Sequence, residues 1–287
     1  MTGAGLRNIQ YCRLEFAHRN TKLARLFPLM PLKPLPLALG FLALTAARLS
    51  ASMIDEIQVY TFDINPVGKF GLELHLNSTF KGRTLPDYPG EITPQHGIRL
   101  TPEFSYGLTH DFEVGLYVPM QRTPAGANDL AGAKLRLKWL PVQPDEKKGG
   151  WFAGANVELS RLNPRFEEGR WSTELRTMIG YRDPEWLLAA NPVLGWTLAG
   201  PDRSARPEAE LQVKASREIA KGIAIGPEYY AGFGPLGRTP GFADQDHSLF
   251  LAFDIDREPW VFNFGIGRGL SRSADRWTVK FIFEVPW

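Results

Sequence analysis

Apolar and polar residues alternate along most of this chain, in segments of about ten residues that begin near Phe70. In a β-strand, successive side chains point to opposite faces, so each segment predicts a strand with one apolar and one polar face. The clearest segment closes the chain, where one face would carry Trp277, Val279, Phe281, Phe283, Val285 and Trp287. Twelve strands are predicted, at residues 69–80, 97–106, 112–119, 130–140, 151–160, 171–181, 186–198, 208–217, 222–233, 247–256, 260–268 and 277–287.

The connections between these segments alternate in length. Those after odd-numbered strands are long and those after even-numbered strands are mostly short, with residues 141–150 as the exception. A transmembrane barrel has long loops at one rim and short turns at the other. A secreted soluble β-sandwich is the alternative, but it has no reason to sort its loops in this way. We therefore predict an all-β fold, a transmembrane antiparallel up-and-down β-barrel of about twelve strands.

The first 52 residues differ from the rest of the chain. They hold seven lysines and arginines but one acid, Glu15, and residues 35–47 are almost wholly apolar. Such a run is too short to span a bilayer but is typical of a signal peptide. We expect a leader cleaved near Ser52, with Met30 as an alternative start. A buried or amphipathic N-terminal helix is disfavoured by Pro34 and Pro36.

The expected organisation is therefore a leader at residues 1–52, a segment at 53–68 and a barrel at 69–287. The role of 53–68 stays open between a plug, an added strand and a periplasmic tail. Removing the leader's seven basic residues and one acid from totals of 33 and 31 leaves 26 and 30, a net charge of −4. No basic surface for nucleic acid is expected. The single cysteine, Cys12, excludes a disulfide framework and a cysteine metal cluster.

The polar faces of the strands carry the candidate chemistry, because they point into the lumen of a small barrel. Opposed acidic and basic walls could orient small polar solutes in an aqueous pore. Alternatively, ion pairs could fill the lumen. A lumen residue such as Arg136 is expected to tolerate replacement by leucine for folding. The lumen-facing candidates are His75, Arg99, Glu103, Arg136, Glu158, Glu174, Arg176, Lys214, Glu228, Lys280 and Glu284.

The histidines beyond the leader do not form a recognisable catalytic or metal motif. His96, His110 and His247 are expected to be solvated loop residues, and His75 and Ser78 cannot share one face of a strand. No zinc-binding histidine pair and no nucleophile elbow occur. We predict no catalytic residues, no metal and no cofactor.

Two runs resemble known families. Residues 277–287 resemble the C-terminal signal of outer-membrane barrels, although Pro286 and Trp287 depart from its usual form. Residues 101–119 resemble a hairpin of bacterial outer-membrane transporters labelled after the meta-pathway of phenol degradation. These resemblances imply the outer membrane of a Gram-negative bacterium, with its lipids, the barrel-assembly machinery and small solutes as partners.

The sequence thus predicts an outer-membrane channel or transporter for small solutes that is not an enzyme. A closed barrel with a structural or accessory role is the alternative. A barrel-embedded lipid hydrolase is less favoured.

Overall fold

The computed structural model describes residues 56–123, 126–201, 203–257 and 259–285. The predicted leader, its cleavage near Ser52 and the terminal Trp287 lie outside these residues. No helix in the described ranges is both long enough and apolar enough to cross a membrane. The one helical element there is a single turn, η1 (Phe242–Asp244).

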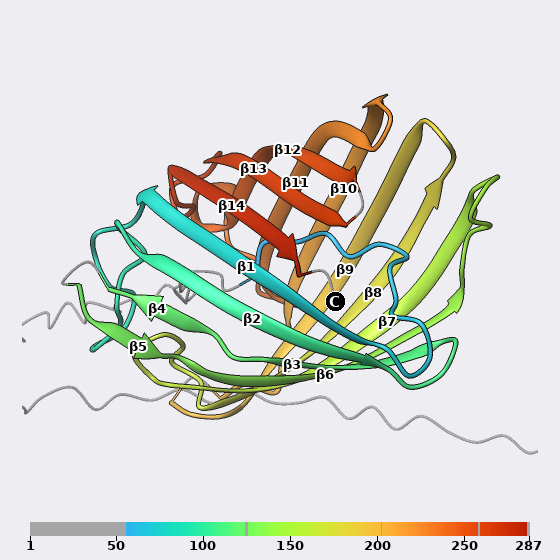
Figure 1. The fold of residues 1–287 in the computed structure, drawn as a ribbon. Helices are drawn as coiled ribbons and strands as arrows, with labels where there is room; N and C mark the ends of the chain where they lie inside the picture. Colours follow the sequence, from blue (N-terminus) through green and yellow to red (C-terminus); the bar gives the residue numbers. More distant parts are fainter. Residues whose placement is uncertain (1–55, 124–125, 202, 258, 286–287) are drawn as a thin grey trace, which may run out of the picture. The chain divides into compact units, whose positions relative to one another are not determined.

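All β-strands of the described residues belong to one antiparallel sheet (Figure 1). They are β1 (Phe70–Lys81), β2 (Ile98–Gly107), β3 (Phe112–Tyr117), β4 (Met120–Arg122), β5 (Asn128–Leu130), β6 (Gly132–Val142), β7 (Gly150–Leu162), β8 (Trp171–Arg182), β9 (Trp186–Ala199), β10 (Glu208–Ala220), β11 (Ile223–Pro235), β12 (Asp246–Arg257), β13 (Trp260–Gly269) and β14 (Trp277–Glu284).

The sheet closes on itself because β1 pairs with both β14 and β2. Strands β3 and β4 both pair with β2, so they are two parts of one barrel strand, interrupted at Val118 and Pro119. Strands β5 and β6 form another such strand, interrupted at Ala131. The Ala131 N–H donates to the Pro119 carbonyl at 2.8 Å, which keeps the two interrupted strands joined. The predicted closed barrel of twelve strands is confirmed.

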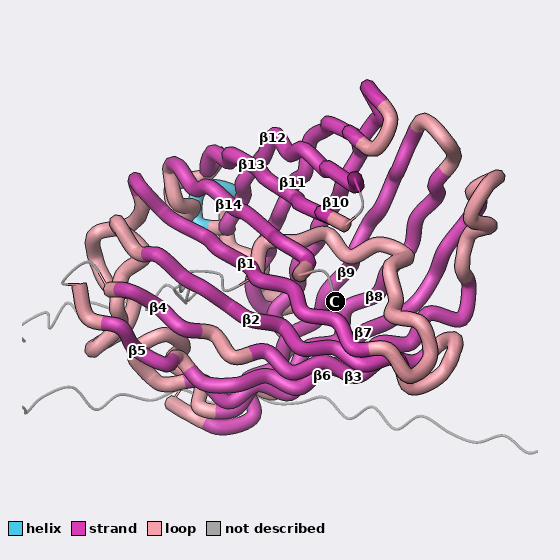
Figure 2. The backbone as a smooth tube through the Cα atoms, viewed as in Figure 1, coloured by secondary structure: helices cyan, strands magenta, loops and turns pink. Residues whose placement is uncertain are grey.

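The two rims of the barrel differ as most of the loop lengths predict (Figure 2). The connection after the third barrel strand, predicted to be long at 120–129, is an exception, because β4 ends at Arg122 and β5 begins at Asn128. Long loops join β1 to β2, β7 to β8, β9 to β10, β11 to β12 and β13 to β14 at one rim. Short turns lie at the other rim. The exceptional connection at 141–150 shortens to 143–149, because β6 continues to Val142 and β7 begins at Gly150.

The outer surface of the wall is apolar. Leu135, Val157 and Ile179 are 58%, 50% and 51% exposed. Their strand neighbours Arg136, Glu158 and Gly180 are buried on the inner side. A continuous exposed apolar surface is unfavourable in water, whereas hydrocarbon lipid accommodates it. Exposed aromatic side chains at strand ends fit the interfacial girdles of such barrels: Trp139, Trp151, Trp171, Trp186 and Trp260.

Two expectations change in the structure. Strand β14 ends at Glu284 rather than at residue 287, although the Val285 N–H still donates to the Leu72 carbonyl at 2.8 Å. His247 is not a solvated loop residue, because it lies in β12 and is buried. The Phe242 ring stacks on His247 with 4.4 Å between ring centroids, and the Tyr229 hydroxyl lies 2.7 Å from its Nδ1. A loop aromatic therefore covers this histidine, which strand alternation alone does not show.

Candidate functional site

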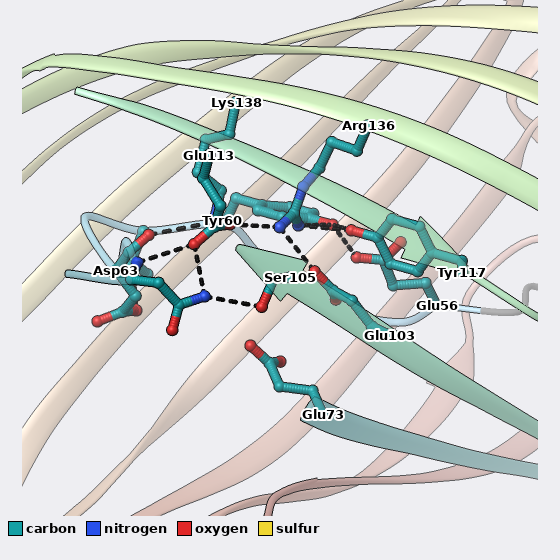
Figure 3. Close-up of polar contacts among 12 residues, drawn as sticks. Glu56, Tyr60, Asp63, Glu73, Glu103, Ser105, Glu113, Tyr117, Arg136 and Lys138 are labelled. Carbon is teal, nitrogen blue, oxygen red and sulfur yellow. Dashed lines mark hydrogen bonds and ion pairs between the residues drawn. The ribbon is translucent and has the colours of Figure 1, made fainter. Parts of the chain in front are cut away.

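Residues 56–66, here called the inner segment, lie inside the barrel. Ile57, Val59 and Tyr60 are buried although they belong to no strand. Tyr60 contacts both Tyr117 of β3 and Asn191 of β9, which are not neighbouring strands. Figure 3 shows the segment running across the inner ends of side chains from the wall. The described part of this segment therefore occupies the lumen and adds no strand to the sheet.

The side-chain amide of Asn191 binds the backbone of the inner segment. The Tyr60 N–H donates to Asn191 Oδ1 at 2.7 Å, and Asn191 Nδ2 donates to the Tyr60 carbonyl at 3.0 Å. A side-chain amide thus replaces the backbone partners that a neighbouring strand would supply. The Tyr60 hydroxyl is fixed separately, at 2.7 Å from the Tyr117 hydroxyl.

A cluster of charges on β2, β3 and β6 binds the same segment (Figure 3). We call Glu103, Glu113, Tyr117, Arg136 and Lys138 the polar clamp. Arg136 Nη2 lies 2.7 Å from Glu103 and 2.5 Å from Glu113, and its Nη1 donates to Tyr117 at 2.5 Å. Lys138 donates to the Asp63 carbonyl at 3.1 Å. Asn65 donates twice to Glu113, from its backbone and from its side chain, both at 2.8 Å.

These contacts argue against the expectation that leucine is tolerated at Arg136. The Arg136 side chain is 2% exposed, and it is shared between two buried carboxylates. Removing one partner of a buried ion pair leaves an uncompensated charge, which is strongly destabilising. Alternation identifies an inward position but does not reveal how many partners a side chain will have.

An apolar seal adjoins the clamp. Ile57 and Val59 of the inner segment pack with Phe152, Ala189, Tyr230 and Phe250 from four strands of the wall. Two glycines make this packing possible. A Cβ at Gly180 would lie 2.1 Å from the Phe152 ring, and one at Gly267 would lie 2.4 Å from the Phe250 ring. The seal therefore joins the segment to the wall by large rings that lie close to glycine residues.

A cavity of about 410 Å³ remains between the inner segment and residues of β1 and of β8 to β14. Residues 182–186 and 222–224, in and beside two short turns, line it, so it lies toward the short-turn rim. Lys280, 1% exposed, is bound to Glu228 inside it. Lys214 lies 3.2 Å from Glu228 and 2.7 Å from Asp254. These contacts join β10, β11, β12 and β14 across the interior.

The predicted lumen residues fall into separate groups. Glu103 and Arg136 belong to the clamp, and His75 contacts Glu103 at 3.1 Å. Lys214, Glu228, Lys280 and the exposed Glu284 line the cavity. The rest form smaller contacts: Arg99 with Gln121 and the Phe166 ring, Glu158 with Lys134, and Arg176 with Glu174 and Gln212.

Sequence reasoning missed the inner-segment residues and Tyr117. Tyr60 contacts Tyr117 and Asn191, which follow it by 57 and 131 positions in the chain. No pattern in the sequence indicates either contact. The one usable signal was the apolar and aromatic content of residues 57–62, which is unusual for a segment placed in water.

Glu56, His75 and Glu103 could offer ligands to a metal ion, since their ligand atoms lie within 4.8 Å of one another. Imidazole and carboxylate ligands suit several divalent metals. Arg136 already neutralises Glu103 at 2.7 Å, however, so the group is accounted for without an ion. Ser78 donates to the Gly97 carbonyl at 3.2 Å, while His75 faces Glu103, so these two residues do not form a nucleophile and base.

The long-loop rim is packed as well. The Ile92 N–H of one loop donates to the Arg165 carbonyl of another at 2.8 Å. Arg83 binds Asp87 and Glu91, and its backbone N–H donates to Asp275 at 3.0 Å. Burial raises the pKa of Glu91 and the pKa of Asp275 above their ordinary values.

A closed barrel with an apolar exterior and a charged, occupied lumen has the fold of an outer-membrane β-barrel. The crystal structure of the COG4313 outer membrane channel from Pseudomonas putida F1 is similar, with a TM-score of 0.57 and 12% identity. The match covers 81% of this chain and 100% of that chain. At this identity the likeness concerns the fold.

Other barrels match less well. The KdgM porin has a TM-score of 0.49 and 8% identity, covering 76% of this chain and 99% of its own. LpxR from Salmonella typhimurium has a TM-score of 0.41 and 10% identity, covering 76% and 100%. No protein-family model matches the sequence, and no curated protein matches it.

Proposed function

We propose that the protein is an outer-membrane channel for small polar solutes and that the inner segment closes it. The observation that carries this proposal is the content of the lumen. The barrel interior holds a peptide segment that belongs to no strand, together with a cavity of about 410 Å³. Displacing the segment would leave the sheet pairing of the barrel unchanged, because none of residues 56–66 takes part in that pairing.

The closing contacts are of a kind that water can replace. The Asn191 amide, the Glu113 carboxylate and the Lys138 ammonium would all become hydrated in an open lumen. An intramolecular hydrogen bond contributes about 0.5–1.5 kcal/mol net, so a few of them can hold a segment without making its release impossible. Exposure of Ile57 and Val59 adds an apolar cost at about 25 cal/mol per Å².

The sequence supports the setting of this channel. The run at 277–287 favours recognition by the barrel-assembly machinery, the leader at 1–52 favours export, and the apolar outer face favours contact with outer-membrane lipids. The hairpin at 101–119 favours membership of the transporter family labelled after the meta-pathway of phenol degradation. A closed accessory barrel is the competing function, and the density of buried contacts in the clamp favours it.

Planar-bilayer recording separates these two functions. The wild type should show rare conductance steps. Asn191→Ala removes two hydrogen bonds to the inner segment, about 2 kcal/mol in total, and should raise the open probability roughly 30-fold. Asn128→Ala is the matched control, because Asn128 is exposed at the long-loop rim. Silence from heat-modifiable, folded protein of all three kinds would establish the closed barrel instead.

A further inference from the structure

Three carboxylates lie side by side on neighbouring strands of the wall. Glu73 of β1 stands directly opposite Glu284 of β14 and directly opposite Glu103 of β2. We call these three residues the carboxylate row. Like charges opposite one another destabilise a sheet, so the row has an energetic cost that positive charge would relieve.

The protein itself supplies only part of that charge. Glu103 lies 2.7 Å from Arg136. Glu73 lies 3.7 Å from His75. Within the described part of the chain, no lysine or arginine nitrogen lies within 4.0 Å of a carboxylate oxygen of Glu73 or Glu284. Both of these residues line the cavity.

The rest of the cavity is acidic too. Its lining contains nine carboxylates and three cationic side chains, a formal excess of six negative charges. The cations are engaged by other groups of the protein. Lys280 is bound to Glu228, Lys214 lies between Glu228 and Asp254, and the Arg182 guanidinium lies 4.7 Å from the centre of the Phe62 ring. The electrostatic potential that a solute meets in the cavity is therefore negative.

Building on the channel function, we propose that the passage selects small solutes of positive charge, such as protonated amines, and that Glu73 and Glu284 determine this selectivity. A cleft lined by one sign of charge within low-dielectric walls concentrates ions of the opposite sign. Rings of acidic side chains select cations in other channels by this means. A cation passing the row would supply the positive charge that Glu73 and Glu284 lack, whereas an anion would add to their repulsion.

Reversal potentials in a KCl gradient test the sign of the selectivity. With Asn191→Ala as the conducting background, potassium should permeate several-fold better than chloride. Adding Glu73→Gln and Glu284→Gln should bring the permeability ratio severalfold closer to one. Glu146→Gln is the control. Glu146 lies in a short turn at the same rim, but it does not line the cavity. This substitution should leave the ratio unchanged.

Liposome swelling tests the solute class with molecules of similar size. At neutral pH glucosamine is mostly protonated, glucose is uncharged and glucuronate is negative, and swelling rates should fall in that order. Each variant is first checked for heat-modifiable migration. If the double variant does not fold, Glu284→Gln alone is used, since Glu284 is exposed at the end of β14.

The two hypotheses fail in different ways. A conducting protein with no preference, or with a preference for anions, would overturn the selectivity and leave the channel standing. An equal loss of selectivity in Glu146→Gln would also overturn the role of the row. The absence of conductance in every variant would overturn both.

Discussion

The two sides of the lumen use the same residue types in different ways. On the clamp side, Glu103 and Glu113 share Arg136, and Asn65 and Lys138 supply further donors to Glu113. On the cavity side, nine carboxylates surround three cations. Balanced charge fills space and holds a segment in place, whereas unbalanced charge leaves a field that acts on solutes. The contrast distinguishes structural ion pairs from a pathway within one barrel.

The largest expected effect lies on the clamp side. Arg136→Leu leaves Glu103 and Glu113 buried without their shared cation, and should lower the free energy of unfolding by about 3–5 kcal/mol. The loss is measured from the urea concentration at which half of the protein has lost its folded, heat-modifiable form. Arg122→Leu, at an exposed position of β4, serves as the control. Equal unfolding of the two variants would show that the clamp does not stabilise the barrel.

The outer face beside the clamp gives the next effect. Leu137 is the strand neighbour of Arg136, is 44% exposed, and lies opposite Val114 and Val157. Leu137→Arg places a charge in the middle of the lipid face and should cost about 2–4 kcal/mol by the same measurement. Leu108→Arg, in a short turn, should cost about 1 kcal/mol or less. The reverse order would contradict the assignment of faces.

The cavity side should respond less strongly to loss of one cation. Lys280→Met removes one partner of Glu228, but Lys214 remains 3.2 Å away. We expect a loss of about 1–3 kcal/mol in unfolding free energy, below that of Arg136→Leu. Lys221→Met, in an exposed turn, is the matched control. A loss larger than that of Arg136→Leu would remove the distinction between the two sides.

The smallest effect concerns the long-loop rim and depends on pH. The pKa of Glu91 and the pKa of Asp275 are raised in the folded protein, so the folded state holds these protons more tightly than the unfolded state. Loop packing should therefore be firmest below their ordinary pKa and should loosen as the pH rises through the raised values. Cleavage of loop 82–97 by a protease active at both pH values should be faster at neutral pH.

Glu91→Gln provides the check on this pH dependence. The amide cannot ionise, so the difference in cleavage between acidic and neutral pH should shrink. An unchanged difference would assign the effect to another group.

The fold could be predicted from the sequence because lipid imposes a simple rule on a barrel wall. Alternation gave the twelve strands and their faces, and loop lengths gave the two rims. The split at Pro119 was not predicted, since a proline at the end of a strand gives the same pattern as one inside an interrupted strand. The burial of His247 was not predicted, because its covering ring, Phe242, comes from a loop.

The content of the lumen could be predicted only in part. The inward positions of Glu103, Arg136 and Glu228 follow from alternation. Their partners depend on how strands that are not neighbours face each other across the barrel, and on where residues 56–66 lie. A polar segment contact such as that between Tyr60 and Asn191 has no periodic signal, so the plug position could be named as one possibility but not selected.

The most direct test of the central claim is a reversible lock on the inner segment. Tyr60→Cys and Asn191→Cys replace two residues joined by two hydrogen bonds, in a chain whose Cys12 is changed to serine. Under reducing conditions the segment is released and planar-bilayer recording should show frequent conductance steps. Oxidation, with the disulfide verified by mass spectrometry, should silence the same channels, and a reductant should restore them. Unaltered conductance after verified oxidation would contradict closure by residues 56–66.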